Sequence, residues 1–390
     1  MIYFDNGATT LPKPDGVFRA VRHAMGLGNP GRGGHNLSLQ GARLLYSVRE
    51  HFCTHFSAPS PNHVCFFYSA TEALNRVMKS VLYQGGTVLI SDMEHNAVRR
   101  PALSLARRGG TVCYFKGHGR EEEIVSSFGA EVKEAHRAGR DVKLAVFLHT
   151  SNICRQTLPV KKLTDLCRKN EILSLVDCAQ AAGHLPLHLQ DLGADGLCMP
   201  SHKGLFGIAG AGVLLCSQKL KDTLEQVPTL VQGGAGSASL EEDMPLFLPE
   251  RLEAGTPGLP AIASMGAGLS FIEKRGYEQI SGQLSMLYKH CADRLMHIQG
   301  ITLQASELWG IGPLLFTADH MDNAVLSDAL SARGVCVREG LHCAPLAHDS
   351  IGTGRDGGIR VSFSVFNTTA QIDRFVCILK EELCAAGACR

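Results

Sequence analysis

The chain is organised around a short apolar run that ends in a polar turn carrying a lysine. It reads Asp195-Gly196-Leu197-Cys198-Met199-Pro200-Ser201-His202-Lys203-Gly204. A lysine placed just beyond the end of a buried strand is poorly hydrated, and burial favours its neutral amine. A neutral amine is a nucleophile towards aldehydes. Lys203 is therefore a candidate covalent anchor for an aldehyde, and the alternative is an ordinary solvated loop lysine.

A second apolar run upstream ends in a carboxylate. Ile172-Leu173-Ser174-Leu175-Val176 leads into Asp177, which taken alone could simply cap a helix. Pyridoxal phosphate requires a lysine for a covalent bond to its aldehyde and a carboxylate that keeps its ring nitrogen protonated. Because Lys203 and Asp177 follow consecutive strands, the sequence favours a pyridoxal phosphate site over two unrelated surface residues.

The first two thirds of the chain alternate strands and helices. This alternation predicts a parallel, doubly wound α/β sheet. The run 210–216 follows Lys203 too closely for a crossover helix, so this strand is expected to run antiparallel. We expect strands at 64–68, 87–91, 110–115, 143–148, 172–176, 195–200 and 210–216, with helices over 15–26, 39–56, 69–82 and 120–138.

Polar side chains follow several of these strands, at the edge where an open α/β sheet binds its ligands. Ser69-Ala70-Thr71 at a strand-to-helix junction offers a phosphate seat, or a simple helix cap. His95 could lie flat on a planar ring, or be a surface histidine, and Asn152 follows the expected strand at 143–148. The glycine-rich loop that ends in His35 either contacts a ligand or is solvated.

The last third of the chain has a different pattern. Residues 231–262 lack periodicity, and irregular segments of this length are usually functional. A helix is expected over 260–297, with a possible kink at Gly276, followed by short strands and helices of a smaller α+β unit that include a strand at 335–338. We expect a large domain over 15–258 and a small domain made of 1–14 and 259–390.

Composition narrows the class of protein. The 390 residues carry a net charge of +1, with 45% hydrophobic and 19% charged residues. These values favour a folded soluble protein and give no reason to expect nucleic acid as a partner. With no basic leader and no apolar run long enough for a bilayer, we expect a cytoplasmic protein without membrane contact. The 14 cysteines form no Cys-x-x-Cys pair, so no metal site is expected.

The order of the motifs resembles a known family across nearly the whole chain. It extends from Tyr3-Phe4-Asp5-Asn6-Gly7-Ala8-Thr9-Thr10 through the Lys203 turn to Arg360-Val361-Ser362-Phe363. The chain resembles class V aminotransferase-fold enzymes that use pyridoxal phosphate, and among them the group II cysteine desulfurases and selenocysteine lyases. The resemblance implies PLP fold type I, with a mostly parallel seven-stranded sheet flanked by helices and a smaller α+β C-terminal domain.

The resemblance also assigns roles to residues. It implies Lys203, Cys343 and His95 as catalytic residues. The implied cofactor contacts are Ala70, Thr71, His95, Asn152, Asp177, Gln180, His202 and Lys203, with Thr256 supplied by the partner subunit of a homodimer. The implied substrate contacts are Asn152, Arg338, Arg360 and His35. Two departures from the family pattern, Ser201 and Ala70, predict adjusted phosphate contacts.

The feature that selects the reaction is Val337-Arg338-Glu339-Gly340-Leu341-His342-Cys343-Ala344-Pro345-Leu346, which resembles the cysteine loop of the desulfurases. We call residues 337–346 the cysteine loop. A neighbouring positive charge favours the nucleophilic thiolate. The resemblance thus implies conversion of L-cysteine to L-alanine, with a persulfide on Cys343 for a sulfur-acceptor protein. The segment 347–358 is unlike the best-known group II members.

Three other interpretations stay open from the sequence. A selenocysteine lyase would act on L-selenocysteine, and selenium leaves carbon more readily than sulfur, so that reaction need not use Cys343. A class V aminotransferase would use the same Lys203 and Asp177 pair. A thiol-rich sulfur carrier without catalytic activity would lack the cofactor and its colour.

Overall fold

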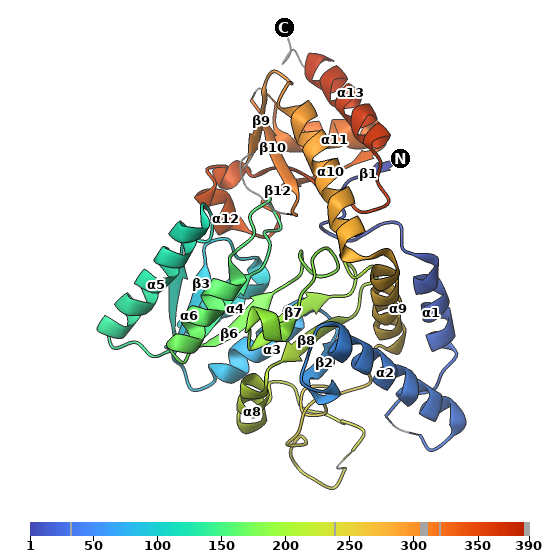
Figure 1. Cartoon of the computed structure of the whole chain (residues 1–390), viewed down its shortest axis with the longest axis vertical. Helices are drawn as coiled ribbons and strands as arrows, with labels where there is room; N and C mark the ends of the chain where they lie inside the picture. Colours follow the sequence, from blue (N-terminus) through green and yellow to red (C-terminus); the bar gives the residue numbers. More distant parts are fainter. Residues whose placement is uncertain (32, 238, 305–310, 320, 386–390) are drawn as a thin grey trace.

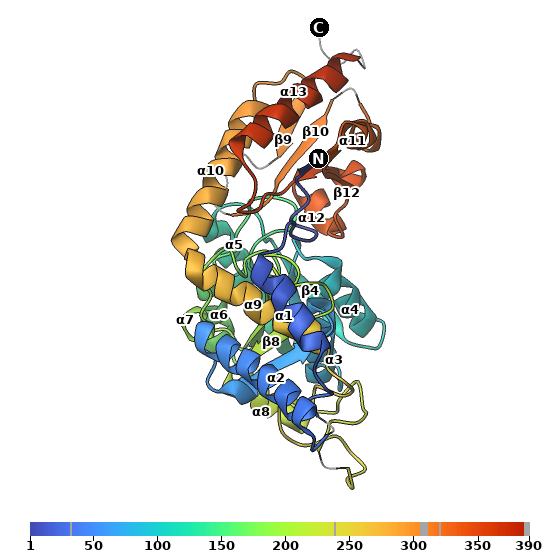
Figure 2. The same ribbon diagram turned by 90° about the vertical axis from the view of Figure 1, so that its right-hand side faces the viewer.

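The computed structural model describes residues 1–31, 33–237, 239–304, 311–319 and 321–385. Its elements form two parts along the long axis, a larger one below and a smaller one above (Figure 1). The first strand, β1 (Ile2–Tyr3), lies in the upper part with the last helix, α13 (Thr369–Ala385) (Figure 2). The chain therefore leaves the smaller part early, builds the larger one and returns.

The larger part is built around a seven-stranded sheet of order β2-β8-β7-β6-β5-β3-β4. Its neighbouring strands are parallel except for β8, which is antiparallel to both β7 and β2. The predicted α/β fold and the predicted antiparallel strand are both confirmed. The strands are β2 (Val64–Phe67), β3 (Thr87–Ser91), β4 (Thr111–Phe115), β5 (Val142–Leu148), β6 (Leu173–Asp177), β7 (Gly196–Pro200) and β8 (Gly212–Cys216).

Both faces of this sheet are buried under helices. Successive side chains of one strand point to opposite faces. In β5, Leu144 and Val146 join the apolar cluster under α3 (Ala70–Val81) and α4 (Asn96–Ala106). Ala145 and Phe147 join the larger cluster on the other face, which includes Phe128 of α5 (Glu121–Arg137). Continuous apolar runs are what a sheet covered on both faces requires.

The remaining helices of the larger part include several that the sequence analysis did not predict. α1 (Asp15–Met25) and α2 (Asn36–His55) lie beside α9 (Leu259–Arg275) (Figure 2). The helices of this part that were not predicted are α4, α6 (Val160–Lys169), α7 (Leu189–Leu192) and α8 (Gln218–Gln226), and a 3-10 turn spans Pro61–His63. Among the described residues, no helix is both long and apolar enough to cross a bilayer.

The predicted helix over 260–297 is broken in two at Gly276. Its φ of 83° lies in the region that favours glycine, so α9 ends there and α10 (Tyr277–Leu295) begins. α9 packs on the larger part, whereas α10 packs against α13. Between α8 and α9 the described residues form neither helix nor strand, as predicted.

The smaller part contains an antiparallel sheet of order β12-β13-β10-β9. The strand expected over 335–338 is split, because β11 (Val335–Cys336) pairs in parallel with β1 while β12 (Arg338–Gly340) joins the four-stranded sheet. The domain limits stay a prediction. The other elements are β9 (Ile301–Gln304), β10 (Leu314–Ala318), α11 (Asn323–Ala332), α12 (Pro345–Ser350), a 3-10 turn (Gly354–Asp356) and β13 (Gly358–Val361).

Candidate active site

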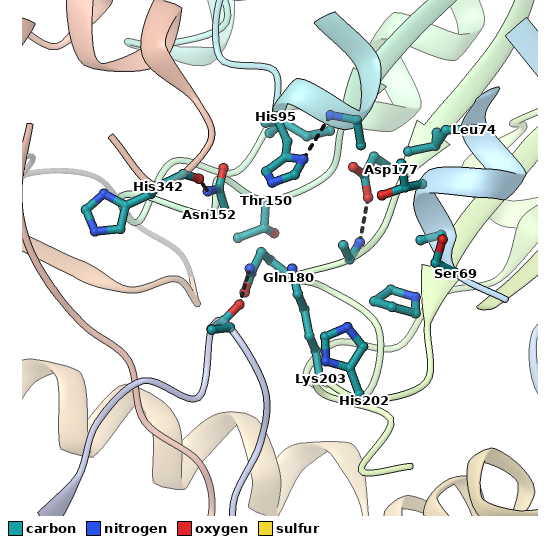
Figure 3. Close-up of a pocket in the computed structure, with 18 of the residues that line it drawn as sticks. Ser69, Leu74, His95, Thr150, Asn152, Asp177, Gln180, His202, Lys203 and His342 are labelled. Atoms are coloured by element: carbon teal, nitrogen blue, oxygen red, sulfur yellow. Dashed lines mark hydrogen bonds between the residues drawn. The ribbon is translucent and has the colours of Figure 1, made fainter. Parts of the chain in front are cut away.

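A cavity of about 250 Å³ lies at the carboxyl edge of the large sheet. We call it the cofactor cavity. Its walls come from the ends of β5, β6 and β7, the first turns of α3 and α4, the N-terminal segment and the smaller part (Figure 3). The lining side chains predicted from the sequence are Ala70, Thr71, His95, Asn152, Asp177, Gln180, His202, Lys203, Arg338 and Arg360. Residues far apart in the sequence thus meet in one place.

The Lys203 turn is held in place by the N-terminal segment. Thr10 donates its hydroxyl to the Lys203 carbonyl at 2.8 Å, and Lys13 donates to the His202 carbonyl at 2.9 Å. Gly204 allows the turn to pack closely, since a Cβ there would lie 2.2 Å from the Ala182 carbonyl oxygen. These contacts fix the backbone of the turn after β7, and with it the position of Lys203.

Lys203 and Asp177 have complementary electrostatic environments. Burial lowers the pKa of Lys203 to about 8, opposed by the negative charge of Asp177 and assisted by Arg360 and Arg338. Burial raises the pKa of Asp177, opposed by the Ala179 amide, which donates to its Oδ1 at 2.9 Å, and by Lys203. A buried carboxylate gains most from a cationic partner. The protonated ring nitrogen of pyridoxal phosphate would be such a partner.

His95 is a neutral ring in the cavity wall. It caps α4, and its Nδ1 accepts the Ala97 amide at 3.0 Å, so the ring proton sits on Nε2. Burial, followed by the positive charge of Lys203, lowers the pKa of His95 to about 4. An uncharged aromatic ring at this position suits stacking on a planar cofactor.

The first turn of α3 has the features of a phosphate site. Ser69 caps the helix by accepting the Glu72 amide at 3.1 Å, and the Ala70 and Thr71 amides belong to the helix's positive end. β8 fits tightly against this turn because its first residue is a glycine, and a Cβ at Gly212 would lie 2.4 Å from the Ser69 carbonyl carbon. Ser69, Ala70 and Thr71 all line the cavity.

The amide side chains of Gln180 and Asn152 are fixed by main-chain partners. Gln180 donates to the Gly7 carbonyl at 3.0 Å, and Asn152 donates to the His342 carbonyl at 2.8 Å (Figure 3). The Asn152 Oδ1 is buried and has no hydrogen-bond partner among the described residues. A buried polar atom without a partner is costly, so a ligand donor at this position would be favoured. Together with Asp177 and the α3 amides, these groups fit pyridoxal phosphate.

Arg360 is fully buried at the side of the cavity that faces the smaller part. Its Nη2 donates to Asp5 at 2.7 Å and its Nη1 to the Asn152 carbonyl at 2.9 Å, while its Nε has no partner among the described residues. Arg338 also lines the cavity, and its Nη2 lies 3.8 Å from the Cys343 Sγ. Two guanidinium groups therefore face the space that a substrate carboxylate would occupy.

Cys343 is exposed at the mouth of the site. It lines a hollow of about 410 Å³ between α3 and α4, which shares Thr71, His95 and Ala97 with the cofactor cavity. The Cys343 carbonyl accepts the Asn96 amide at 2.7 Å, so the first turn of α4 holds the cysteine loop against the larger part. A thiol at this junction is open to solvent and borders the cavity.

Besides Cys343, two further predicted residues, His35 and Thr256, lie outside the cofactor cavity. His35 is exposed and caps α2, its Nδ1 accepting the Ser38 amide at 3.3 Å. The Thr256 carbonyl accepts the Tyr68 hydroxyl at 2.9 Å, and the Thr256 hydroxyl accepts the Asn29 amide at 3.3 Å. The substrate role of His35 and the cross-subunit role of Thr256 stay predictions.

Sequence reasoning assigned no role to two carboxylates beside the site. Asp5 pairs with Arg360, and the only signal was its position after the first strand. Glu94 is fully buried, accepts the Leu148 amide at 2.9 Å and has its pKa raised by burial to about 8. Glu94 lies three residues after the end of β3, and a charged residue so close to the end of an apolar strand is a signal that could have drawn attention to it.

The family is settled by comparison with known proteins. The family model described as Aminotransferase class-V matches residues 2–375. The chain therefore belongs to the class-V aminotransferase family, whose members use pyridoxal phosphate, and it is an enzyme of this cofactor class. The predicted family and cofactor are confirmed.

Similar proteins share most of the chain. A probable cysteine desulfurase of Methanothermobacter thermautotrophicus is 29% identical, covering 95% of this chain and 92% of that protein. Another, of Pyrococcus abyssi, is 28% identical, covering 98% of this chain and 94% of that protein. The apo structure of a cysteine desulfurase from Thermococcus onnurineus superposes with a TM-score of 0.88 at 26% identity, covering 98% of this chain and 95% of that one.

Proposed function

We propose that the protein is a cysteine desulfurase that converts L-cysteine to L-alanine and keeps the sulfur as a persulfide on Cys343. One observation carries the proposal: an exposed thiol, 3.8 Å from the Arg338 guanidinium, borders the cavity that contains Lys203. An aminotransferase on the same fold has no use for a thiol at this position. The names of the relatives support the same reaction.

Different residues of the cavity would bind different parts of pyridoxal phosphate. The α3 amides and His202 would hold the phosphate, Asp177 would pair with the ring nitrogen, and His95 would lie against the ring face. When bound, the cofactor supplies an aldehyde for a covalent bond to Lys203 and a ring that withdraws electrons from the amino acid. Once released, the Lys203 amine is placed to take the proton from the substrate α-carbon, for which a pKa near 8 is suitable.

The sulfur transfer requires the substrate to be fixed between the arginines and Cys343. Arg360 and Arg338 bind its carboxylate, with Asn152 beside it. The Cys343 thiolate then forms a bond to the substrate sulfur, and the bond between that sulfur and the β-carbon breaks. The electron pair stays on the β-carbon, which takes up a proton, and return of a proton from Lys203 to the α-carbon completes alanine. The persulfide is left for a thiol acceptor.

The test is replacement of the proposed nucleophile. Cys343→Ala should lower alanine formation from L-cysteine by about a hundredfold or more, because among the described residues no other cysteine lines the cofactor cavity or the outer hollow. The matched control is Cys377→Ala, which removes an exposed cysteine from α13. Undiminished turnover in the Cys343→Ala variant would exclude this thiol as the sulfur carrier.

Selenocysteine is the second candidate substrate. Cys343 lines the outer hollow, so a reaction that does not need a thiol could proceed in the cavity alone. Selenium leaves carbon more readily than sulfur. A selenocysteine lyase would keep its turnover of L-selenocysteine in the Cys343→Ala variant, and comparison of the two substrates separates the alternatives.

The working unit that we propose is a cytoplasmic homodimer. Thr256 lies outside the cofactor cavity of its own chain and would serve the phosphate site of the partner subunit. The chemistry needs Cys343 as a reduced thiol, which a reducing compartment such as the cytoplasm maintains. The acceptor would be a sulfur-acceptor protein that docks at the mouth of the site, where Cys343 is exposed.

A further inference from the structure

The ring of His342, next to Cys343, points away from the cofactor cavity. Figure 3 shows this ring turned outward, whereas the His342 carbonyl meets Asn152 inside the site. The ring stacks on His348 of α12, with centroids 5.4 Å apart and an angle of 22° between the planes. Both histidines are almost fully buried. The residue before the proposed nucleophile is thus anchored by a group in the segment 347–358, for which the resemblance implies no role.

The hydrogen bonds of the two rings form one directed chain. The Arg338 carbonyl can only accept, so His342 Nε2 donates to it at 3.0 Å. In a neutral ring the other nitrogen then accepts, so His348 Nε2 donates to His342 Nδ1 at 3.2 Å. His348 Nδ1 in turn accepts the Thr353 hydroxyl at 2.7 Å. Each donor meets an acceptor in this single arrangement of protons.

Charge and burial are consistent with this arrangement. Burial is the main cause that lowers the pKa of His342 to about 3, with the positive charge of Arg360 second. Burial also lowers the pKa of His348 to about 4, opposed by Asp349. Both rings are therefore neutral near neutral pH, as the hydrogen-bond chain requires.

The backbone beside these rings needs such support. His342 has a φ of 49° and Cys343 a φ of 58°, two consecutive residues in the left-handed region that side chains disfavour. Backbone in this region persists when its surroundings over-determine it. The Asn152 and Asn96 contacts hold only the carbonyls of His342 and Cys343, so the orientation of the His342 ring depends on Arg338 and His348.

We propose that His348 is a positioning residue for Cys343, which acts by locking the His342 ring and thereby the left-handed turn that presents the thiol. The proposal rests on the function proposed above, because a positioned thiol matters only if Cys343 takes the sulfur. A misplacement of about 1 Å can slow a reaction by about a hundredfold, so the loss of a locking contact should be measurable.

The experiment compares His348→Leu with His348→Gln in the cofactor-loaded enzyme. Leucine removes the donor to His342, whereas the glutamine amide can still donate. His348→Leu should lower kcat for alanine formation from L-cysteine by about tenfold with KM little changed, and His348→Gln should recover most of this loss. Asp349→Asn, the exposed neighbour, is the matched control and should behave as wild type.

A second readout does not depend on activity. The Asn96 amide is protected by the Cys343 carbonyl, so its hydrogen exchange reports whether the turn is in place. Exchange at Asn96 and across 341–347 should be about tenfold faster in His348→Leu, and close to wild type in His348→Gln. Thr353→Val removes the hydroxyl donor to His348 and serves as the test if His348→Leu does not fold. Hydrogen exchange in this variant should be faster than in the wild type, by a smaller factor than expected for His348→Leu.

The outcomes separate this proposal from the proposed function. Wild-type exchange and wild-type turnover in the leucine variant would overturn the positioning role of His348, and so would equal losses in the leucine and glutamine variants. Alanine formation by Cys343→Ala at the wild-type rate would instead overturn the proposed function. In that case the exchange measurements would still report whether His348 holds the turn.

Discussion

The two groups that we propose to react, the Lys203 amine and the Cys343 thiol, are held in very different ways. Lys203 follows β7, which is paired on both sides within the seven-stranded sheet, and the carbonyls of its turn are fixed by Thr10 and Lys13. Cys343 lies between a three-residue strand and a six-residue helix, with a positive φ and an exposed side chain. The position of Lys203 is thus fixed by the core of the larger part, whereas the position of Cys343 depends on a few polar contacts.

This difference separates two properties of the enzyme. Residues at the ends of core strands cannot move without disturbing the sheet, so the cofactor chemistry is tied to global stability. A loop held by single hydrogen bonds can open locally at a small cost in free energy. The choice of reaction can therefore change by altering the cysteine loop, while the cofactor site stays intact.

The largest effect is expected from Lys203→Ala. This change should abolish covalent attachment of the cofactor and lower alanine formation from L-cysteine by about a thousandfold or more, because we propose the amine as both anchor and base. Borohydride reduction followed by mass spectrometry would show no cofactor bonded to the chain. Cys343→Ala, in contrast, should keep the covalently attached cofactor.

Lys219→Ala on α8 is the control for the lysine variant. If borohydride still fixed the cofactor to another lysine of the Lys203→Ala protein, Lys203 would not be the anchor that the strand end holds in place. Lys13 would then be the first candidate, since its amine donates to the His202 carbonyl beside the cavity.

An intermediate effect is expected in the pH dependence of stability of the cofactor-free protein. The pKa of Lys203 falls from 10.5 to about 8 on folding, so between these values the unfolded chain holds a proton that the native chain has released. Stability from this group therefore rises with pH across that window, by roughly 3 kcal/mol in total. Below about pH 8 the native protein carries the buried Lys203 charge, and its full cost lowers the free energy of unfolding.

Urea unfolding of the wild type and Lys203→Met would isolate this contribution. The methionine variant should be the more stable at about pH 7, and the difference should shrink as the pH approaches 10.5. A difference that stays constant with pH would show that Lys203 is not desolvated in the native state.

The smallest effect is expected from Ser350→Ala in the smaller part. The Ser350 hydroxyl donates to Asp92 of the larger part at 2.8 Å and helps to hold α12 in place. Loss of one such bond is worth about 1 kcal/mol, so exchange across 341–350 should rise by about fivefold. Cofactor binding should not change, because Lys203 does not depend on this contact.

Ser281→Ala is the matched control for this loss, since the Ser281 hydroxyl donates to Glu278 within α10. Equal exchange in the Ser350→Ala variant and the wild type would mean that the loop is held more firmly than its polar contacts indicate. A loss of cofactor in that variant would contradict the independence of the two regions.

Local pattern predicted much of the fold. Apolar runs of strand length and the alternation of strands with helices predict the parallel sheet, and the short connection after Lys203 predicts the antiparallel β8. α6 was not predicted, although Val160, Leu163 and Cys167 recur at helical spacing and are buried, because a helix of ten residues gives only a short periodic signal. The split between β11 and β12 depends on pairing with a two-residue strand, and so short a strand leaves no pattern.

The site was predictable where function follows from strand ends. Asp177 is the last residue of β6, and Lys203 and Asn152 lie within four residues of the ends of β7 and β5, at the edge where an open sheet binds its ligands. Asp5 and His348 were not predictable, because their roles come from contacts with Arg360 and His342 that only the folded chain creates. Long-range pairing of this kind leaves no periodic signal in the sequence.

The first ten residues have a consequence for how such an enzyme can evolve. Asp5 holds Arg360, Gly7 accepts from Gln180, and Thr10 holds the Lys203 turn, so one short segment is a shared wall of both parts. A Cβ at Gly7 would lie 3.2 Å from the Arg360 guanidinium carbon. Substitutions here would alter substrate recognition and the seating of the smaller part together, so these two properties cannot drift independently.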